Sequence, residues 1–515
     1  MRPFQQFRLW ARRAPIGERV GAAAVAVIAV ALVSWLLVSP SDDDSPSAST
    51  NVEAANGAQG AGDQSGDSTT TLLDGPATTI AGGTSSGTGS FSGSGSQSSS
   101  SGSGGCVSPP GSDQGISDKE VRIAMLLVNL AGPAANNTFN VPSAENQKLD
   151  YEAVIDDINA HGGVVCRKLV PVWFTINPLD QANLQQTCLD IAEAKVFYVN
   201  DLGGYAAFPA LTDCYPQHQL PFFEGNMLPQ SALDKGYPYM FAAASQDIEY
   251  FNAAHSLAQS GWFDPAKGFK KLGYLYRDCS PELPQKMQKW LHDVGVPASQ
   301  IVTYNIGCPV APTSPSDDAN AVIKFQGAGV THVLVSLAES DWTTFTGIAA
   351  RQNYKPRYAM PDQAISFSAY GSQPPDWNNA DGAIVITQYR FGEEHTPGYP
   401  RSSGTDRCAK ISKAHGRPDP YNEQIGMPGV ACNQLAFFVA AISHAPTLKR
   451  DALVAGLRAS PPFDFSYPYG PATFPTPRST HAGNFWRFLI AHADCSCFRV
   501  PDPNFKPTFP GYDGP

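Results

Sequence analysis

The sequence predicts an α/β fold with two similar lobes, each built around a doubly wound, Rossmann-like parallel β-sheet. Three observations support this prediction. Residues 151–177 contain a helix pattern, a double glycine and a strand pattern in one short unit. Units of this kind recur along the chain as far as residue 387. The predicted strands are more than a single sheet usually holds, and they form two series that look alike. Two lobes are therefore the simplest interpretation.

The unit at residues 151–177 shows the reasoning most clearly. Its helix has apolar residues at i, i+3, i+4 and i+7, which are Tyr151, Val154, Ile155 and Ile158. Gly162 and Gly163 supply the positive φ that ends such a helix. The strand that follows alternates apolar residues, namely Val170, Val172 and Phe174. One amphipathic helix therefore leads directly into a strand.

The same patterns define the other elements. Strands are expected at 121–128, 169–175, 196–200, 220–223, 272–276, 301–304, 332–336, 357–360 and 383–387. Helices are expected at 144–160, 181–194, 206–217, 248–260, 282–294, 317–328, 341–353, 406–415, 430–444 and 449–458. The last fifty-odd residues are rich in proline and aromatic residues, and we expect an irregular tail packed on the surface.

The N-terminal region predicts a membrane attachment. Residues 1–19 carry five arginines and one acidic residue, which places them in the cytoplasm as a basic tail. Residues 20–39 contain an uncharged run of about 27 Å as a helix, just enough to cross a membrane as a single-pass anchor. The alternative is a cleaved signal peptide, although no convincing A-x-A-like site follows the run. The globular part is extracytoplasmic in both cases, and it is secreted if the segment is cleaved.

Residues 40–106 are dominated by serine, glycine and threonine and have few aliphatic side chains, so they cannot bury a core. We expect a disordered linker there, with a root-mean-square span of roughly 45 Å. Its simplest role is to hold the globular part, residues 107–515, away from the membrane.

Charge and cysteine content restrict the function. A net charge of −11 and a pI near 5.4 argue against nucleic-acid binding, which needs a basic face. All ten cysteines follow the apolar segment, as export to an oxidising compartment predicts. Proximity in sequence favours three disulfides: Cys188 with Cys214, Cys279 with Cys308, and Cys408 with Cys432. Cys166 is expected in a disulfide, whereas Cys495 and Cys497 are expected to pair elsewhere because they are so close in sequence.

The order of segments in the chain resembles the type I periplasmic binding-protein family, in particular its branched-chain amino-acid (Leu/Ile/Val-type) substrate-binding members. The matching pieces are VRIAMLLVNLAG, YEAVIDDINAHGGVVCRKLVPVWF, CLDIAEAKVFYVND, QLPFFEGN, YPYMFAA, KKLGYLYRD and GVTHVLVSLAESDWTTF. In that family the chain crosses three times between the lobes. The resemblance implies a first lobe of about 119–243 and 389–455, and a second of about 244–388 and 456–515.

Ligands of open parallel sheets bind beyond the carboxyl ends of the strands. The loops expected there, read together with the resemblance, imply a ligand site formed by Asn200, Gly204, Tyr205, Asn226, Glu282, Glu339 and Asp362. In amino-acid-binding relatives an acid of the second lobe takes the ligand ammonium, and Asp362 matches that acid. The loop at 200–205 has no serine or threonine, and Glu282 and Glu339 replace positions that are often aromatic. These departures favour a cationic or polyhydroxy ligand, although turn and cap roles are the alternative for each acid.

The function that this implies is capture of a small polar solute for the permease subunits of an ABC-type importer. The alternative is a membrane-tethered ligand sensor with the same fold. We expect no enzyme, because no nucleophile, base and oxyanion donors assemble in the sequence. We also expect no cofactor, because metal-ligand motifs and phosphate-binding loops are missing from it.

Overall fold

The structure is a computed structural model that describes residues 106–515 apart from 131, 134–135, 137–140, 179, 201–208, 309–314, 337–338, 362–373, 422–426, 475, 477 and 515. The predicted anchor, and the predicted linker as far as residue 105, lie outside the described residues. Within the described part, no helix is both long enough and apolar enough to cross a membrane.

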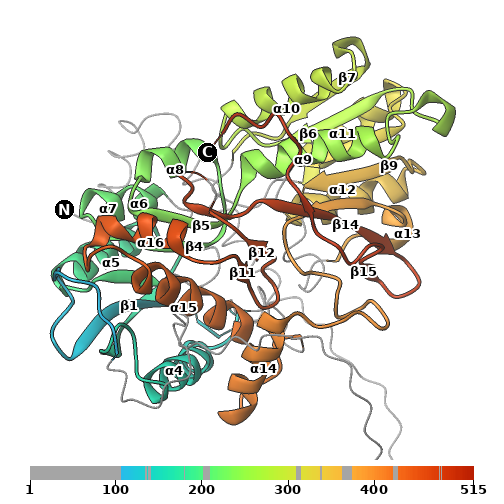
Figure 1. The fold of residues 1–515 in the computed structure, drawn as a ribbon. Helices are drawn as coiled ribbons and strands as arrows, with labels where there is room; N and C mark the ends of the chain where they lie inside the picture. Colours follow the sequence, from blue (N-terminus) through green and yellow to red (C-terminus); the bar gives the residue numbers. More distant parts are fainter. Residues whose placement is uncertain are drawn as a thin grey trace, which may run out of the picture. The chain divides into compact units, whose positions relative to one another are not determined.

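The first sheet is entirely parallel and has the strand order β13-β5-β4-β3-β1-β2. Figure 1 labels β1, β4 and β5 of this sheet. Its strands are β1 (Glu120–Val128), β2 (Lys168–Ile176), β3 (Tyr198–Asn200), β4 (Phe222–Leu228), β5 (Met240–Ser245) and β13 (His481–Gly483). The helices α4 (Ala144–Ala160) and α15 (Met427–Ser443) pack on each other, and aromatic residues of α15 contact β3, β4 and β5. A second group contains α5 (Gln181–Glu193), α6 (Pro209–Thr212) and α7 (Cys214–Gln217). This sheet and its helices are the first lobe.

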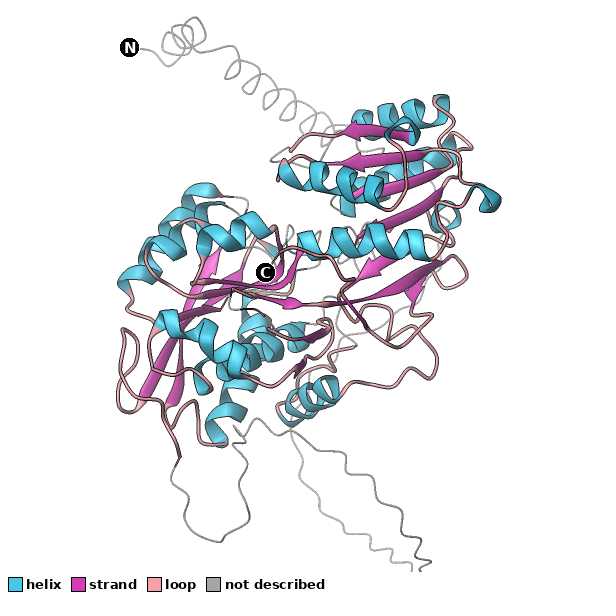
Figure 2. Cartoon of the chain, turned by 45° about the horizontal axis from the view of Figure 1, so that its top comes forward, coloured by secondary structure: helices cyan, strands magenta, loops and turns pink. Residues whose placement is uncertain are grey.

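The second sheet has the order β15-β14-β10-β9-β8-β6-β7, with β16 paired to β14. The parallel strands are β6 (Leu272–Tyr276), β7 (Ile301–Asn305), β8 (His332–Ser336), β9 (Arg357–Pro361) and β10 (Ile384–Thr387). The strands β14 (Phe485–His492), β15 (Cys497–Arg499) and β16 (Lys506–Pro507) are antiparallel additions at one edge. Figure 2 shows the strands of the two sheets as separate groups with helices packed on them.

Two separate apolar clusters cover the second sheet. Helices α9 (Gln246–Gln259) and α10 (Glu282–Asp293) contribute Leu257, Met287 and Leu291 to one cluster. Helices α11 (Pro315–Gly327) and α12 (Glu339–Arg351) contribute Val322, Phe325 and Phe345 to the other. A parallel sheet buried in this way needs nearly continuous apolar strands, as β8 has. This sheet and its helices are the second lobe.

The remaining elements join the lobes or cover one of them. They are α8 (Gln230–Gly236), α13 (Trp377–Ala380), α14 (Ser403–Ala414), α16 (Leu453–Ala459), and the two-stranded sheet of β11 (Phe463–Asp464) and β12 (Pro471–Ala472). Every strand that the sequence predicts is present, but β5 was not predicted because its sequence MFAAAS shows no alternation. The helix expected at 206–217 is two short helices, α6 and α7, in the described residues.

The C-terminal tail differs most from its prediction. It is expected to be irregular and to belong to the second lobe, but it supplies β13 to the first sheet and β14 and β15 to the second. An edge strand has unpaired backbone groups, and the tail strands satisfy those of β5 in the first sheet and of β10 in the second. The chain therefore crosses between the sheets after Ser245, at Gln388, and at Asn484 rather than near residue 455.

All ten cysteines form disulfides. The three predicted pairs are present, and Cys166 pairs with Cys106. The expectation for Cys495 and Cys497 is wrong, because these two residues pair with each other. Ser496 between them has a φ of 50°, and this turn brings their Cα atoms to 5.2 Å, within the range that a disulfide spans.

Candidate functional site

The predicted ligand residues belong to the carboxyl ends of the parallel strands, and the structure describes them unevenly. Asn200 is the last residue of β3, and Glu282 is the first residue of α10. Asn226 lies inside β4 rather than in a loop, at a register irregularity between Glu224 and Met227. Glu339 begins α12, and only its backbone is described, as for Asn226. The other three predicted residues, Gly204, Tyr205 and Asp362, lie outside the described residues.

Asn200 is fully buried and its side chain is held from a distant helix. Its Nδ2 donates to Oε1 of Gln434 on α15 at 2.8 Å, and the Tyr151 hydroxyl donates to the same oxygen at 2.6 Å. Strand periodicity places Tyr198 on the same face as Asn200, and Tyr198 packs on Phe438 of α15 with ring centroids 4.6 Å apart. Helix α15 thus presents an aromatic and an amide, four residues apart, to the end of β3.

The Oδ1 of Asn200 is buried and has no hydrogen-bond partner among the described residues. A buried acceptor without a partner costs about 1–3 kcal/mol, so such an atom in a native fold needs an explanation. Because Gln434 takes the donor side of the amide, the acceptor side is turned away from α15. A hydroxyl or ammonium group of a bound molecule would satisfy it.

Asn433, the residue before Gln434 on α15, links the end of β3 to the segment at 464–466. The Asn433 side chain accepts from the backbone N–H of Ser466 and donates to its carbonyl, both at 2.7 Å. No role was predicted for Asn433 or Gln434 from the sequence. The available signal was an adjacent Asn–Gln pair inside an otherwise apolar helix.

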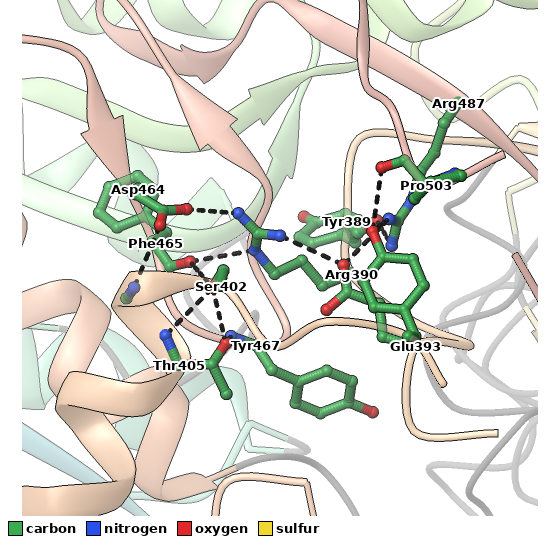
Figure 3. Close-up of polar contacts among 12 residues, drawn as sticks. Tyr389, Arg390, Glu393, Ser402, Thr405, Asp464, Phe465, Tyr467, Arg487 and Pro503 are labelled. Atoms are coloured by element: carbon green, nitrogen blue, oxygen red, sulfur yellow. Dashed lines mark hydrogen bonds and ion pairs between the residues drawn. The ribbon is translucent and has the colours of Figure 1, made fainter. Parts of the chain in front are cut away.

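A buried ionic cluster lies beside the second crossing, and it too was missed (Figure 3). Oε1 of Glu393 accepts from Arg487 at 2.9 Å and from Arg390 at 3.2 Å, and the side chains of Glu393 and Arg487 are 0% and 1% exposed. Arg390 also pairs with Asp464 at 2.5 Å and donates to the Phe465 carbonyl at 3.0 Å. The second Glu393 oxygen accepts from the Tyr421 hydroxyl at 2.7 Å. The ionic cluster therefore connects the segment after β10 with Tyr421 between α14 and α15, with β11 and with β14.

The comparison with known families decides what this architecture is. A family model described as periplasmic binding protein matches residues 120–488, which include the parallel strands of both sheets and all three crossings. The chain belongs to the periplasmic binding protein family. The match covers the region in which the sequence pieces resemble type I members.

Solved structures of periplasmic binding proteins share this fold at low sequence identity. A type 1 protein from Bordetella pertussis Tohama I is 16% identical with a TM-score of 0.55, over 76% of this chain and 100% of that one. A solute-binding protein from R. palustris in complex with 4-hydroxybenzoate is 14% identical with a TM-score of 0.56, over 76% and 99%. A substrate-binding protein from Desulfitobacterium hafniense in complex with Leu is 17% identical with a TM-score of 0.51, over 76% and 100%. No curated protein matches the chain in sequence.

In this binding protein, the acids at the carboxyl end of β6 already have partners. Asp278 accepts from the Asn305 side chain at 2.8 Å, and the Cys279–Cys308 disulfide joins the segments that follow β6 and β7. Glu282 accepts a hydrogen bond from the hydroxyl of Ser231, on α8 of the first lobe. Glu282 therefore joins the lobes in the structure, whatever its role toward a ligand.

Asp247, at the start of α9, makes a second connection between the lobes. Its carboxylate accepts from the backbone N–H of Gln230 on α8 at 2.7 Å and from Lys286 on α10 at 2.5 Å. The aspartate is almost fully buried. Helix α8 of the first lobe is thus tied to α9 and α10 of the second.

A cavity of about 430 Å³ lies beside the contact of α8 with α9 and α10. It is lined by α9, α10 and residues 510–514, with Phe251, Trp290 and Tyr512 among its aromatic residues. Of the predicted ligand residues that the structure describes, none lines it. The charged residues at its rim are paired with each other, Lys286 with Asp247 and Lys289 with Asp293.

Burial changes the proton affinity of one carboxyl near the second crossing. Glu394 follows the ionic cluster, and burial raises the pKa of its carboxyl to about 7, against weaker opposing effects of backbone hydrogen bonds, Tyr467 and Arg487. His395 lies 3.6 Å from the same carboxylate, and burial lowers the pKa of this histidine. Arg390 and Arg487 form their ion pairs with Glu393, and Arg487 offsets the effect of burial on Glu394 only weakly.

Proposed function

We propose that this protein is an extracytoplasmic solute-binding protein that captures a small polar solute between its two lobes for an ABC-type importer. The observation that carries the proposal is the family match across both sheets and all three crossings. Two lobes joined by short crossings can close on a ligand by a hinge motion. The solute would lie at the carboxyl ends of the parallel strands.

The described part of the site favours a solute with hydrogen-bond donors. Among the described residues no group donates to the buried Oδ1 of Asn200, and the acids predicted around it add negative charge. A hydroxyl-rich or cationic solute fits this chemistry better than a simple anion. The similar proteins are in complex with ligands as different as Leu and 4-hydroxybenzoate, so the fold alone does not select the solute.

The proposal includes a membrane location. The uncharged run in residues 20–39 would anchor the protein, and the linker would let the binding domain reach permease subunits. The N-terminal sequence of the mature protein tests this part. A mature terminus near residue 40 would contradict an anchor, and an intact residue 1 would agree with it.

The binding proposal is tested by thermal unfolding of the full chain with defined solutes: leucine, arginine, putrescine, a hexose and 4-hydroxybenzoate. A solute at 100 times its Kd stabilises the native state by about 2.7 kcal/mol, so a binder raises the melting temperature measurably. We expect one of the hydroxyl-rich or cationic solutes to do so. If no solute in a broad screen stabilises the protein and native mass spectrometry detects no co-purified small molecule, the binding role is wrong.

A variant pair then tests the predicted site with the binder identified in that screen. Asp362→Ala should weaken its affinity at least tenfold, because Asp362 matches the acid that takes a cationic group in relatives. Asp278→Ala is the matched control, because Asp278 already pairs with Asn305 and should change affinity little. Equal affinities of the two variants would refute the placement of that contact.

A further inference from the structure

The side chain of Gln388 lies where the three crossings between the lobes meet. Gln388 is almost fully buried and follows directly after β10, at the second crossing. Its amide nitrogen, Nε2, donates to the carbonyl of Ser245 at 3.3 Å, and Ser245 is the last residue of β5 at the first crossing. One side chain thus connects two crossings that are 143 residues apart.

The third crossing contacts the other end of the same amide. Gly483 ends β13, immediately before the crossing at Asn484, and it pairs in register with Ala244 of β5. A Cβ at Gly483 would overlap Oε1 of Gln388 and would lie 3.2 Å from the Ala244 Cβ. Glycine at this position therefore lets the amide of Gln388 pack directly against the backbone of β13.

The backbone of Gln388 is enclosed as well. A Cβ at Gly470 would overlap the Gln388 carbonyl oxygen, and the next residue, Tyr389, forms a bridge with Tyr469. Tyr469 contacts Phe223 of the first sheet. Gln388 is consequently fixed to the first lobe on one side while β10 fixes it to the second.

We propose that Gln388 is the positioning residue of the hinge, and that its amide makes the three crossings bend as one unit. The pairing of β13 with β5 already joins the crossings after Ser245 and at Asn484. Without the Gln388 amide, the crossing at Gln388 would move independently of these two, and the angle between the lobes would vary more widely. The inference goes beyond the proposed function because it concerns the motion of the lobes and requires no solute.

The contacts suggest two independent ways to break this coupling. Gln388→Met keeps the length of the side chain but removes the donor to Ser245. Gly483→Ala leaves Gln388 in place but displaces its amide, since the overlapping atom is the end of a flexible side chain. Because both changes act through the one side-chain amide of Gln388, the double variant should behave like either single variant.

The experiment is a distance measurement between the lobes by electron paramagnetic resonance, with spin labels on noncanonical residues at Glu193 and Ile323 of the full chain. Both positions are exposed, on α5 of the first lobe and α11 of the second. We expect the distance distribution to be about twice as wide in Gln388→Met, Gly483→Ala and the double variant as in the native protein. The matched control is Gln246→Met, because the amide of Gln246, at the start of α9, donates to the Met227 carbonyl of β4 and so joins one crossing, rather than several, to the first lobe.

Each outcome decides the proposal. An unchanged width in Gln388→Met, an equal broadening in Gln246→Met, or additive broadening in the double variant would overturn it. If Gly483→Ala fails to fold, recovery of folding in the double variant supports the proposed contact, and continued failure counts against it. A protein that binds no solute but shows the expected widths would contradict the proposed function and leave the hinge inference standing.

Discussion

The crossing region and the carboxyl ends of the strands are stabilised by different chemistry. At the second crossing, Glu393 holds two arginines in a site almost without solvent. At the end of β3, the buried groups are neutral, since an amide of Gln434 holds the amide of Asn200. Buried charges cost desolvation energy and tolerate few alternative geometries, which suits a junction that must keep one arrangement. A neutral amide can leave one acceptor open, which suits a surface for ligands.

The largest expected effect is at Glu393. Glu393→Gln should lower the free energy of unfolding by about 3–5 kcal/mol, because removing one partner leaves buried charge uncompensated. Asp464→Asn is the matched control, since the Asp464 side chain is 39% exposed and water can replace its contact with Arg390. Urea unfolding of both variants measures the difference. Equal losses would mean that the crossing does not depend on buried charge.

The next largest effect is a pH dependence of the unfolding free energy, which we expect in the crossing region because of Glu394. The folded pKa of Glu394 is raised to about 7, so its contribution to stability is present below the unfolded pKa and is lost as the pH rises through 7. Glu394→Gln removes this loss. Relative to the native protein, the variant should gain roughly 3 kcal/mol between pH 4 and pH 8. Chemical unfolding across that range tests it, and parallel curves for the two proteins would contradict it.

A smaller effect is expected at the carboxyl end of β3. Gln434→Leu should cost about 1–2 kcal/mol, because the donors of Asn200 and Tyr151 lose their shared acceptor. Tyr151→Phe removes only one of the two bonds and should cost less. The two changes should not be additive, since they act on one oxygen. A loss at Gln434 as large as that at Glu393 would erase the contrast between the regions.

The smallest effect is expected where the lobes touch at the surface. Ser231→Ala removes the exposed hydrogen bond to Glu282 and should change the unfolding free energy by less than about 1 kcal/mol. The free energy of unfolding of this variant, compared with that of Gln434→Leu, checks the ranking. A loss of several kcal/mol would mean that this contact, and not the buried crossing, holds the lobes together.

Much of the fold could be predicted because its signals are local. The unit at 151–177 forms α4 and β2 as its periodicity indicates, and three disulfides follow from proximity in sequence. The candidate site was less accessible. Asn200 follows from its place at a strand end, whereas Gln434 lies 234 residues away and shows only as an amide in an apolar helix. The partners of Arg390 and Arg487 could not be predicted either, since no local pattern pairs them.

The sequence by itself determined the α/β class, the alternation of strands and helices, the disulfides of neighbouring cysteines and the resemblance to type I binding proteins. These properties depend on side-chain periodicity and on short separations along the chain. Only the tertiary structure decided where the tail strands pair, which residue of α15 holds Asn200, and that Gln388 lies between three crossings. Those contacts join segments far apart in the chain, and they exist because folding brings unpaired sheet edges and buried polar groups to the partners that satisfy them.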